Sequence, residues 1–315
     1  MTKNLAQIGM GTWGRIVYKS AKNLPNINIS CVVSKNPETQ YFVGPEVSII
    51  DDWRQVDQSG SDLDGVIITC SPYMHKDLLE HFLKKGKYVF IEKPVTLSIL
   101  EMERIDEIVS SSSLYYFVDY VHLHSSAYKT LKKYILDNDI QIKSVKSEGY
   151  NLGPVRDYSP LWDYGPHDIS LIIDLIGNDF ELIEAKKAMI KGEKSFMTEA
   201  SLKIFRNDFE TIVKLYFGNS EKSKSRKLTL QCEGQTICLD DTLEDKIRII
   251  EYGENEIDVV SSRNLEIEFN KCSPVENSLQ NFYDFMCQGA VNEKWHCYSK
   301  KITSLLSKIE NSINQ

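Results

Sequence analysis

The sequence lacks the cysteine patterns of a disulfide framework or a zinc site. Its seven cysteines are an odd number, and no two of them form a C-x-x-C pair. Several lie in apolar runs, as Cys70 does after Ile-Ile-Thr. Disulfide frameworks use even numbers of cysteines, and structural zinc sites use paired ligands. We therefore expect buried, reduced thiols and no metal.

The sequence also lacks an excess of positive charge and any long apolar run. It has 37 Lys and Arg residues against 45 Asp and Glu residues, which gives a net charge of -8. Proteins that bind nucleic-acid phosphates need a basic surface, so this balance argues against a nucleic-acid partner. No apolar run approaches the length of a membrane span, and no basic and apolar leader precedes the first apolar strand. We therefore expect a cytoplasmic protein without a membrane partner.

The length and the pattern of elements predict two domains. A chain of 315 residues exceeds the usual size of a single core. The first third alternates short apolar strands with helical stretches, which predicts an α/β domain of parallel strands over residues 1–120. Residues 121–315 form the second predicted domain. There, successive strands from about 180 to 269 favour antiparallel pairing, and two helices, near 275–287 and 298–313, close the chain.

A glycine-rich turn follows the first apolar strand and opens a helical stretch. The turn is a complete G-x-G-x-x-G motif, Gly9-Met10-Gly11-Thr12-Trp13-Gly14. In this motif the first glycine permits a tight turn, the second lets the backbone approach a pyrophosphate, and the third lets the helix pack close to the strand. The amides around Thr12 and Trp13 would face the phosphates with the helix dipole behind them. The motif predicts dinucleotide binding, and a glycine-rich turn without a ligand is the alternative.

The end of the second strand bears on the choice of cofactor. About twenty residues after the glycines, NAD enzymes commonly place an Asp or Glu on the ribose 2′-hydroxyl. Ser34 and Lys35 stand there in this chain. Because a cation can pair with a 2′-phosphate, we expect NADP(H) to be favoured over NAD(H). The alternative is that Lys35 points to water and that Glu38 or a shifted turn contacts the ribose.

Two further strand–helix turns should face the cofactor, because ligands of open α/β sheets bind beyond the carboxyl ends of the strands. The first turn offers four candidate cofactor-binding residues: Thr69, Ser71, Pro72 and His75. Ser71 could instead cap the following helix, and His75 could be a structural residue of that helix.

The second of these turns, Glu92-Lys93-Pro94, follows the strand over 88–91. A lysine held in a cleft between an acid and a proline can exchange a proton with a substrate hydroxyl. Lys93 is therefore a candidate catalytic residue, and a surface ion-pair lysine is the alternative.

An Asp and a His stand four residues apart before a predicted helix over 166–176. The side chains of Asp163 and His167 could converge in front of this helix. A histidine beside a carboxylate is a natural acid/base unit. The alternatives are a helix N-cap for Asp163, with Pro166 in the first turn, and a core polar contact for His167. No third ligand is spaced with these two residues, which argues against a metal.

Together these motifs resemble the glucose–fructose oxidoreductase / inositol dehydrogenase / rhizopine catabolism (Gfo/Idh/MocA) family. The order and spacing fit along the first 180 residues, and the later strand-rich region fits only in style. The resemblance implies a doubly wound Rossmann domain followed by an α+β domain with a large open, mainly antiparallel sheet. Family members commonly form dimers or tetramers through that sheet, so we expect a homodimer or homotetramer.

The resemblance also implies roles for individual residues. Lys93 matches the catalytic lysine, and Asp163 and His167 match the substrate-side pair. Glu92 and the turn from Thr69 to His75 would lie near the nicotinamide ribose. Asn151 and Arg156 lie in a segment like that of members acting on sugars or nucleotide-linked sugars, and join Lys93, Asp163 and His167 as candidate substrate-binding residues. The sequence departs from many members at Tyr73 and at Leu123-His124, which bears on how a substrate is oriented.

The reaction implied is reversible hydride transfer between nicotinamide and a ring carbon of a sugar, cyclitol or nucleotide-linked sugar. Lys93 or His167 would exchange the hydroxyl proton, and Asp163 would fix the sugar hydroxyls. Two alternatives stay open: a redox-neutral, NAD-dependent glycosidase, and a non-catalytic NADP(H)-binding regulatory protein. The presence of Lys93, Asp163 and His167 together argues against the regulatory protein.

Overall fold

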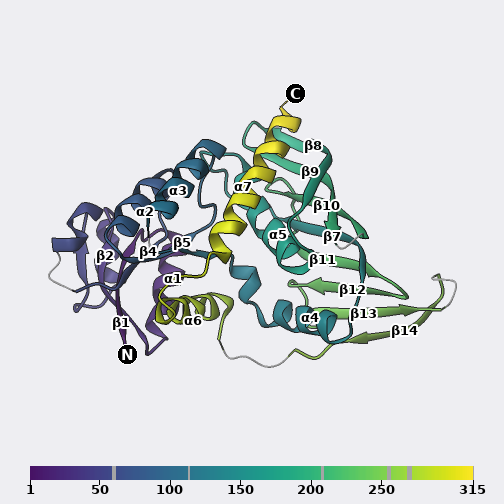
Figure 1. Ribbon diagram of the computed structural model, residues 1–315, viewed down its shortest axis with the longest axis horizontal. Coiled ribbons are helices and arrows are strands. Elements are labelled where there is room, and N and C mark those ends of the chain that lie inside the picture. The colour runs from purple at the N-terminus through teal and green to yellow at the C-terminus, as the bar shows by residue number, and fades with distance from the viewer. Residues whose placement is uncertain (59–61, 113, 207–208, 254–256, 268–271, 315) are drawn as a thin grey trace. The chain divides into compact units, whose positions relative to one another are not determined.

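The chain folds into two compact units, each built around one β-sheet (Figure 1). The computed structural model describes residues 1–58, 62–112, 114–206, 209–253, 257–267 and 272–314. The first unit comprises Met1–Val121 and Cys272–Thr303, and the second comprises His122–Lys271 and Ser304–Gln315. The helix Lys294–Ile313 (α7) therefore contributes residues to both units.

The sheet of the first unit has six parallel strands in the order β3-β2-β1-β4-β5-β6. The strands are β1 (Lys3–Ile8), β2 (Ile27–Val33), β3 (Ser48–Ile50), β4 (Gly65–Ile68), β5 (Tyr88–Glu92) and β6 (Phe117–Asp119). The order reverses between β1 and β4, the point at which doubly wound folds bind dinucleotides. All four residues of β4 are buried, as expected for a strand with both faces covered. The predicted Rossmann sheet is confirmed.

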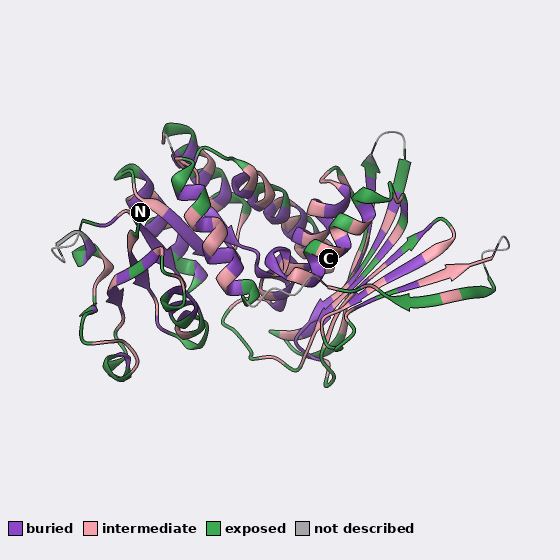
Figure 2. Cartoon of the chain, turned by 90° about the horizontal axis from the view of Figure 1, so that it is seen from below, coloured by how far each residue is buried: buried purple, intermediate pink, exposed green. Residues whose placement is uncertain are grey.

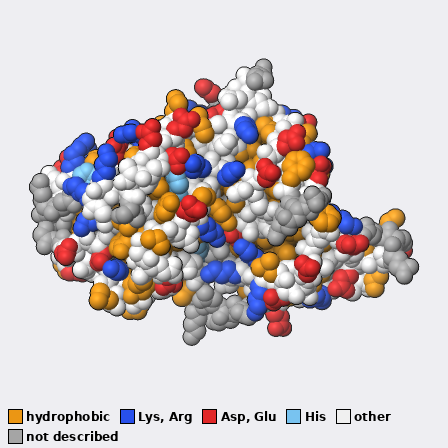
Figure 3. Space-filling model, viewed as in Figure 1, with side chains coloured by type: hydrophobic (Ala, Val, Ile, Leu, Met, Phe, Trp, Pro, Cys, Tyr) orange, Lys and Arg blue, Asp and Glu red, His pale blue; other side chains and the backbone are white. Residues whose placement is uncertain are grey.

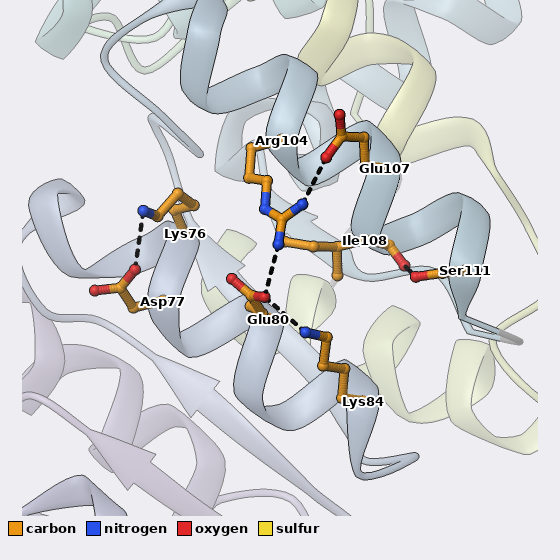
Figure 4. Close-up of polar contacts among 8 residues, drawn as sticks. All are labelled: Lys76, Asp77, Glu80, Lys84, Arg104, Glu107, Ile108 and Ser111. Atoms are coloured by element: carbon orange, nitrogen blue, oxygen red, sulfur yellow. Dashed lines mark hydrogen bonds and ion pairs between the residues drawn. The ribbon is translucent and has the colours of Figure 1, made fainter.

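The helices of this unit are amphipathic and place their apolar sides on the sheet. They are α1 (Thr12–Lys22), α2 (His75–Lys84), α3 (Ile99–Ser111), α6 (Pro274–Cys287) and the first part of α7. On the outer surface of α2 and α3, Glu80 contacts Lys84 at 2.7 Å and Arg104 at 3.1 Å (Figure 4). Exposed ion pairs of this kind contribute only a few tenths of a kcal/mol. Burial of residues such as Phe82 and Ile105, both 0% exposed, contributes far more.

Residues 272–303 return to the first unit, although the sequence analysis grouped them with the second domain. The ring of Phe117 in β6 lies 5.8 Å from those of Phe282 and Phe285 in α6 and 4.8 Å from that of Trp295 in α7. These rings cover the sheet at its β6 edge. A change of pattern along the chain cannot reveal this return, because the contacts join residues more than 150 positions apart.

The second unit contains an eight-stranded, mainly antiparallel sheet, as predicted. Its order is β14-β13-β12-β11-β7-β10-β9-β8, and among the described strand pairs only β7 and β10 run parallel. The strands are β7 (Ile142–Tyr150), β8 (Phe180–Gly192), β9 (Ser195–Arg206), β10 (Phe209–Gly218), β11 (Ser225–Cys232), β12 (Gln235–Asp240), β13 (Ile247–Tyr252) and β14 (Val259–Asn264). The helices α4 (Ser126–Asp137) and α5 (Pro160–Ile176) belong to this unit, together with the last part of α7.

One face of this sheet is buried and the other is open. Alternate residues of β7, β9 and β10 are buried, and α5 packs on these strands. Figure 2 shows buried residues alternating with less buried ones along strands of this sheet. A Cβ on Gly165 of α5 would lie 3.2 Å from the ring of Phe217 in β10, so the helix backbone approaches the sheet closely. Figure 3 shows Lys or Arg and Asp or Glu side chains interspersed on the face that it draws.

All seven cysteines lie in the described residues, and no disulfide joins them. Cys31 and Cys232 are buried, but Cys272 and Cys287 are exposed, so the expectation of buried thiols is wrong for these two. Among the described residues, no helix is both long enough and apolar enough to cross a membrane.

A buried carboxyl group joins α5 to the sheet. Asp168 is 5% exposed, and its Oδ1 accepts a hydrogen bond from Ser147 Oγ of β7 at 2.6 Å. Arg226 of β11 places Nη1 4.0 Å from Oδ2 of Asp168. Burial raises the pKa of Asp168, and the positive charge of Arg226 opposes this rise. Arg226 therefore compensates a charge that would otherwise be costly to bury.

We expect Arg226→Met to lower the free energy of unfolding by about 1–3 kcal/mol, because it leaves a buried carboxylate without a counter-charge. Urea unfolding measures the change. Arg248→Met is the matched control, since Arg248 is exposed and its Nε donates to Ser262 Oγ at 2.8 Å. Its cost should stay within about 0.5 kcal/mol. In the double variant with Asp168→Asn, the cost of Arg226→Met should shrink. An equal cost in both backgrounds would contradict this account.

Candidate functional site

Each glycine of the G-x-G-x-x-G turn occupies a position with its own steric requirement. Gly9 has φ of +103°, and a Cβ there would lie 2.8 Å from the backbone of Thr69 and Cys70. A Cβ on Gly14 would overlap the carbonyl oxygen of Gly9. Nothing lies within 4 Å of the corresponding position on Gly11. Side chains are therefore excluded at Gly9 and Gly14, and the backbone at Gly11 can be approached by a ligand.

A buried glutamine holds this turn, and the sequence analysis missed it. Gln7 is 0% exposed, and its Nε2 donates to the carbonyl oxygens of Gly14 at 2.7 Å and Gly9 at 3.2 Å. Thr69 Oγ1 donates to the same oxygen of Gly9 at 2.8 Å. The available signal was a polar residue inside an apolar strand, just before the glycines. The turn is thus fixed by side chains of β1 and of the residue after β4.

The N-terminus of α1 is suited to an anion. Its N-cap is Gly11, which has no side chain to cap the helix, and the first turn contains no acidic residue. The first amides of a helix have no partner within the helix and lie at the positive end of its dipole. Thr12 and Trp13 are exposed there. These residues fit the pyrophosphate of a dinucleotide.

At the end of β2, Ser34 and Lys35 have different surroundings. Ser34 Oγ lies 2.7 Å from Thr39 Oγ1 and accepts from the amide of Asn36, so it stabilises the local turn. Lys35 is exposed. Glu38, the acid of the alternative reading, pairs with Arg15 at 3.3 Å.

His75 connects two of the predicted turns. It is 0% exposed, with Nδ1 2.9 Å from the carbonyl oxygen of Pro94 and Nε2 3.3 Å from that of Cys70. Burial lowers the pKa of His75 to about 4, so the ring is neutral at physiological pH. Its contacts match the structural alternative considered from the sequence. Pro72 is also buried, whereas Ser71 is exposed and forms no side-chain bond that caps the turn Pro72–Met74.

The Glu92-Lys93 pair lies at the same edge of the sheet. Glu92 ends β5, is 7% exposed, and accepts a hydrogen bond from Trp13 Nε1. Lys93 follows it, is partly buried, and precedes a cis peptide bond to Pro94. The carboxyl ends of β1, β4 and β5 are neighbours in the sheet. The structure therefore brings together the glycine turn, the Thr69–His75 turn and the Glu92-Lys93 pair.

In the second unit, α5 begins six residues earlier than predicted. Ser159 caps the helix, accepting from the amide of Leu161 at 3.2 Å, and Pro160 occupies the first position. Pro166 therefore lies inside the helix, and Asp163 is not the N-cap. A Ser-Pro pair is a strong helix start, and the prediction overlooked it because Pro166 offered a second start. Asp163 and His167 are one helical turn apart and only partly buried.

Other polar residues surround this pair. Arg156 Nε lies 3.4 Å from Asp163 Oδ2. The ring of His167 packs edge-on against that of His122, at 4.7 Å between centroids. A small cavity beside them is lined by residues including His122, His167, Asp168, Arg226 and Asp241. The sequence analysis did not identify His122 or Asp241, which lie far from Asp163 along the chain and have no distinguishing pattern.

The candidate substrate residue Asn151 is held from α5. Tyr164 Oη donates to Asn151 Oδ1, and the guanidinium of Arg226 lies over the ring of Tyr164 at 5.6 Å. Asn151, Arg156, Asp163 and His167 all belong to the second unit, and Lys93 belongs to the first. No group of three or more His, Cys, Asp or Glu side chains within the described part of the chain could hold a metal ion.

Known proteins resemble this chain in sequence and in fold. The inositol 2-dehydrogenase of Rhizobium meliloti is 23% identical over 60% of this chain and 60% of its own length. The scyllo-inositol 2-dehydrogenase (NAD(+)) of Bacillus subtilis is 27% identical over 54% of this chain and 50% of its own. This chain thus matches little more than half the length of these relatives.

Two solved structures extend the likeness of fold to nearly the whole chain. A protein of Magnetospirillum magnetotacticum MS-1 superposes with a TM-score of 0.83 at 25% identity, covering 98% of this chain and 99% of that one. The 3-ketoreductase KijD10 of Actinomadura kijaniata, in complex with TDP-benzene and NADP, superposes with a TM-score of 0.82 at 16% identity, covering 99% and 98%.

The model of one family matches the first unit. Residues 3–120 match the oxidoreductase family with an NAD-binding Rossmann fold, in agreement with the glycine turn and the strand order. Over these residues, which make up less than half of the chain, the sequence is similar to the Gfo/Idh/MocA oxidoreductase family.

Proposed function

We propose that this chain is a nicotinamide-dependent oxidoreductase that interconverts an alcohol and a ketone on a ring carbon of a cyclitol or sugar. The observation that carries the proposal is the glycine turn, clamped by Gln7 and Thr69 and open at Gly11 in front of α1. The inositol dehydrogenases among the relatives support the substrate class. The cofactor, when bound, supplies or accepts the hydride at its nicotinamide ring.

Residues of the first unit would bind the cofactor in three groups. Gly9, Gly11 and Gly14, with the amides at Thr12 and Trp13, would hold the pyrophosphate. Ser34 and Lys35 would lie at the adenosine ribose. The group nearest the nicotinamide would be Thr69, Ser71, Pro72, His75 and Glu92, of which His75 acts by holding the turns in place.

Residues of the second unit would bind the substrate. Asp163 would accept hydrogen bonds from ring hydroxyls, and Arg156, 3.4 Å away, would hold its charge and orientation. Asn151 would contribute further polar contacts. Lys93 and His167 are the candidates for exchanging the hydroxyl proton, and the packing of His122 against His167 supports a fixed ring orientation.

We also propose that the subunits associate through the open face of the eight-stranded sheet. This face carries charges of both signs, including Lys146, Glu148, Glu199 and Lys214, with Tyr216 among them. A face that mixes both signs can be complementary to a second copy of itself. The exposed apolar residue Phe205 of β9 alternates with the buried Ile204 and lies on the same face as Glu199.

The oligomer should have two or four times the chain mass of 36.2 kDa. Analytical ultracentrifugation across a range of concentrations measures the mass. A particle that stays at the mass of one chain at micromolar concentration would remove the proposed association.

NADP(H) should be preferred over NAD(H), because Lys35 is exposed at the end of β2 and Glu38 is engaged by Arg15. We expect Lys35→Ala to raise KM for NADPH by roughly tenfold, since a charge-assisted hydrogen bond is lost, and to leave KM for NADH within about twofold. Steady-state kinetics with both cofactors measures this. Lys22→Ala is the control, because Lys22 is on α1 and pairs with Glu46 at 2.8 Å. An equal rise for both cofactors would count against a 2′-phosphate contact.

Lys93→Ala should lower kcat by on the order of 10² to 10⁴, which is the usual contribution of general acid/base catalysis. NADPH binding, followed by fluorescence, should persist. The assay is NAD(P)⁺ reduction with inositols and sugars, or NADPH oxidation with their keto forms. Lys84→Ala, which removes an exposed partner of Glu80, should leave kcat unchanged. Full turnover by Lys93→Ala would eliminate the lysine as the group that moves the proton.

The same assays distinguish the proposed oxidoreductase from the two alternative functions, a glycosidase and a regulatory protein. A redox-neutral glycosidase would retain tightly bound cofactor through purification and show no net change in NADPH. A regulatory protein would bind NADPH and be insensitive to loss of Lys93, Asp163 or His167 in every enzymatic assay.

A further inference from the structure

Two buried carboxyl groups face each other at the carboxyl ends of β5 and β6. Glu92 and Asp119 are direct partners in the register of these parallel strands. Glu92 is 7% exposed and Asp119 is 0% exposed. Two neighbouring carboxylates cannot both be ionised at such a site without a large cost in free energy.

The hydrogen bonds around the pair leave one carboxyl oxygen without a donor among the described residues. Glu92 Oε1 accepts from Trp13 Nε1, and Asp119 Oδ1 accepts from Ser278 Oγ at 2.7 Å. No donor reaches Asp119 Oδ2 from the described residues, yet the side chains of Glu92 and Asp119 are within hydrogen-bonding distance of each other. Two carboxyl groups form a hydrogen bond only when a proton lies between them.

We propose that Glu92 and Asp119 share one proton, and that Asp119 is thereby a positioning residue for the nicotinamide cofactor. The shared proton fixes the carboxyl group of Glu92 against Trp13, and Trp13 belongs to the first turn of α1. Asp119 thus acts on the cofactor site through Glu92. This role rests on the proposed function, whereas the shared proton itself does not.

The groups around the pair determine how it responds to pH. Burial first, and the negative charge of Asp119 second, raise the pKa of Glu92 well above its usual range, and burial also raises the pKa of Asp119. Lys93 is the charged neighbour of both, and it lowers both pKa values. Trp13 and Ser278, which contact the pair from α1 and α6, are uncharged. With one proton shared, the pair carries one negative charge, and loss of that proton as the pH rises adds a second.

The raised pKa values of Glu92 and Asp119 make the stability of the native state depend on pH. The native state binds more protons than the unfolded state at every pH between the ordinary carboxyl pKa of about 4 and the raised value in the pair. The stability of the native state must therefore fall as pH rises through that window and level off above it.

Asp119→Asn tests the pair without removing its shape. The amide can accept from Ser278 and donate Nδ2–H to Glu92, so Glu92 needs no proton. In the wild type, infrared spectra should show a protonated carboxyl band at neutral pH that disappears at alkaline pH, and the variant should lack it. The fall of the thermal midpoint between pH 5 and pH 9 should be smaller in Asp119→Asn. Both measurements use the chain without cofactor.

NADPH affinity provides the test of positioning. Raising the pH from 7 to 9 adds a second charge beneath the glycine turn, so wild-type affinity should fall on the order of tenfold, and that of Asp119→Asn should change less than about twofold. Ser278→Ala removes a neighbouring hydrogen bond but keeps both carboxyl groups, so its affinity should still fall as the pH rises. The fall should come at a higher pH than in the wild type, because the bond from Ser278 lowers the pKa of Asp119.

The outcomes distinguish the two proposals. A missing protonated band, or the same pH dependence of the thermal midpoint in wild type and Asp119→Asn, overturns the shared proton. A protonated band together with parallel affinity profiles overturns the positioning role. If the band is present and NADPH and NADH both fail to bind at any pH, the proposed function fails, and the positioning role fails with it, while the shared proton stands.

Discussion

The close approach of the Gly9 backbone to the residues after β4 is the contact on which the proposed cofactor site depends. Any side chain at Gly9 would meet the backbone of Thr69 and Cys70, and any side chain at Gly14 would meet Gly9 itself. Gln7 and Thr69 then hold the turn by hydrogen bonds to its carbonyl groups. The amide groups that remain unused at the start of α1 are therefore aimed outward by the packing behind them, before any ligand is present.

In the second unit, two buried or partly buried residues of opposite charge support the candidate site. The helix α5 carries Asp163 and His167, and its buried side carries Asp168, which is bonded to Ser147 and faces Arg226. Arg226 also covers Tyr164, which holds Asn151. One arginine of the sheet thus supports both α5, which carries Asp163 and His167, and the segment that carries Asn151. Polar residues beneath such a site orient the residues that touch the ligand.

Local patterns predicted much of this chain, and long-range contacts account for what they missed. The glycine motif, the alternation of strands and helices, and the later run of strands were sufficient for both sheets and for the glycine turn. His122 and Asp119 were missed because each acquires its role from a partner that is distant in sequence, His167 and Ser278 respectively. Gln7 was missed although Gly9 and Gly14 are close to it in sequence, because the direction of its side chain depends on how the turn folds. The start of α5 was misplaced because Pro160 and Pro166 both allow a helix start locally, and only Ser159 distinguishes them.

The chain passes between the two units at three points, after residues 121, 271 and 303. Neither unit is a continuous piece of the gene product. A fragment ending at residue 121 would leave the aromatic face of Phe90 and Phe117 without Phe282 and Trp295, so it would be prone to aggregate. The same holds during synthesis on the ribosome. The parallel sheet of the first unit is made first, but its packing cannot be completed until α6 and the first half of α7 have been made. The unit whose strands are synthesised first therefore reaches its final packing only after the strands of the second unit have been made.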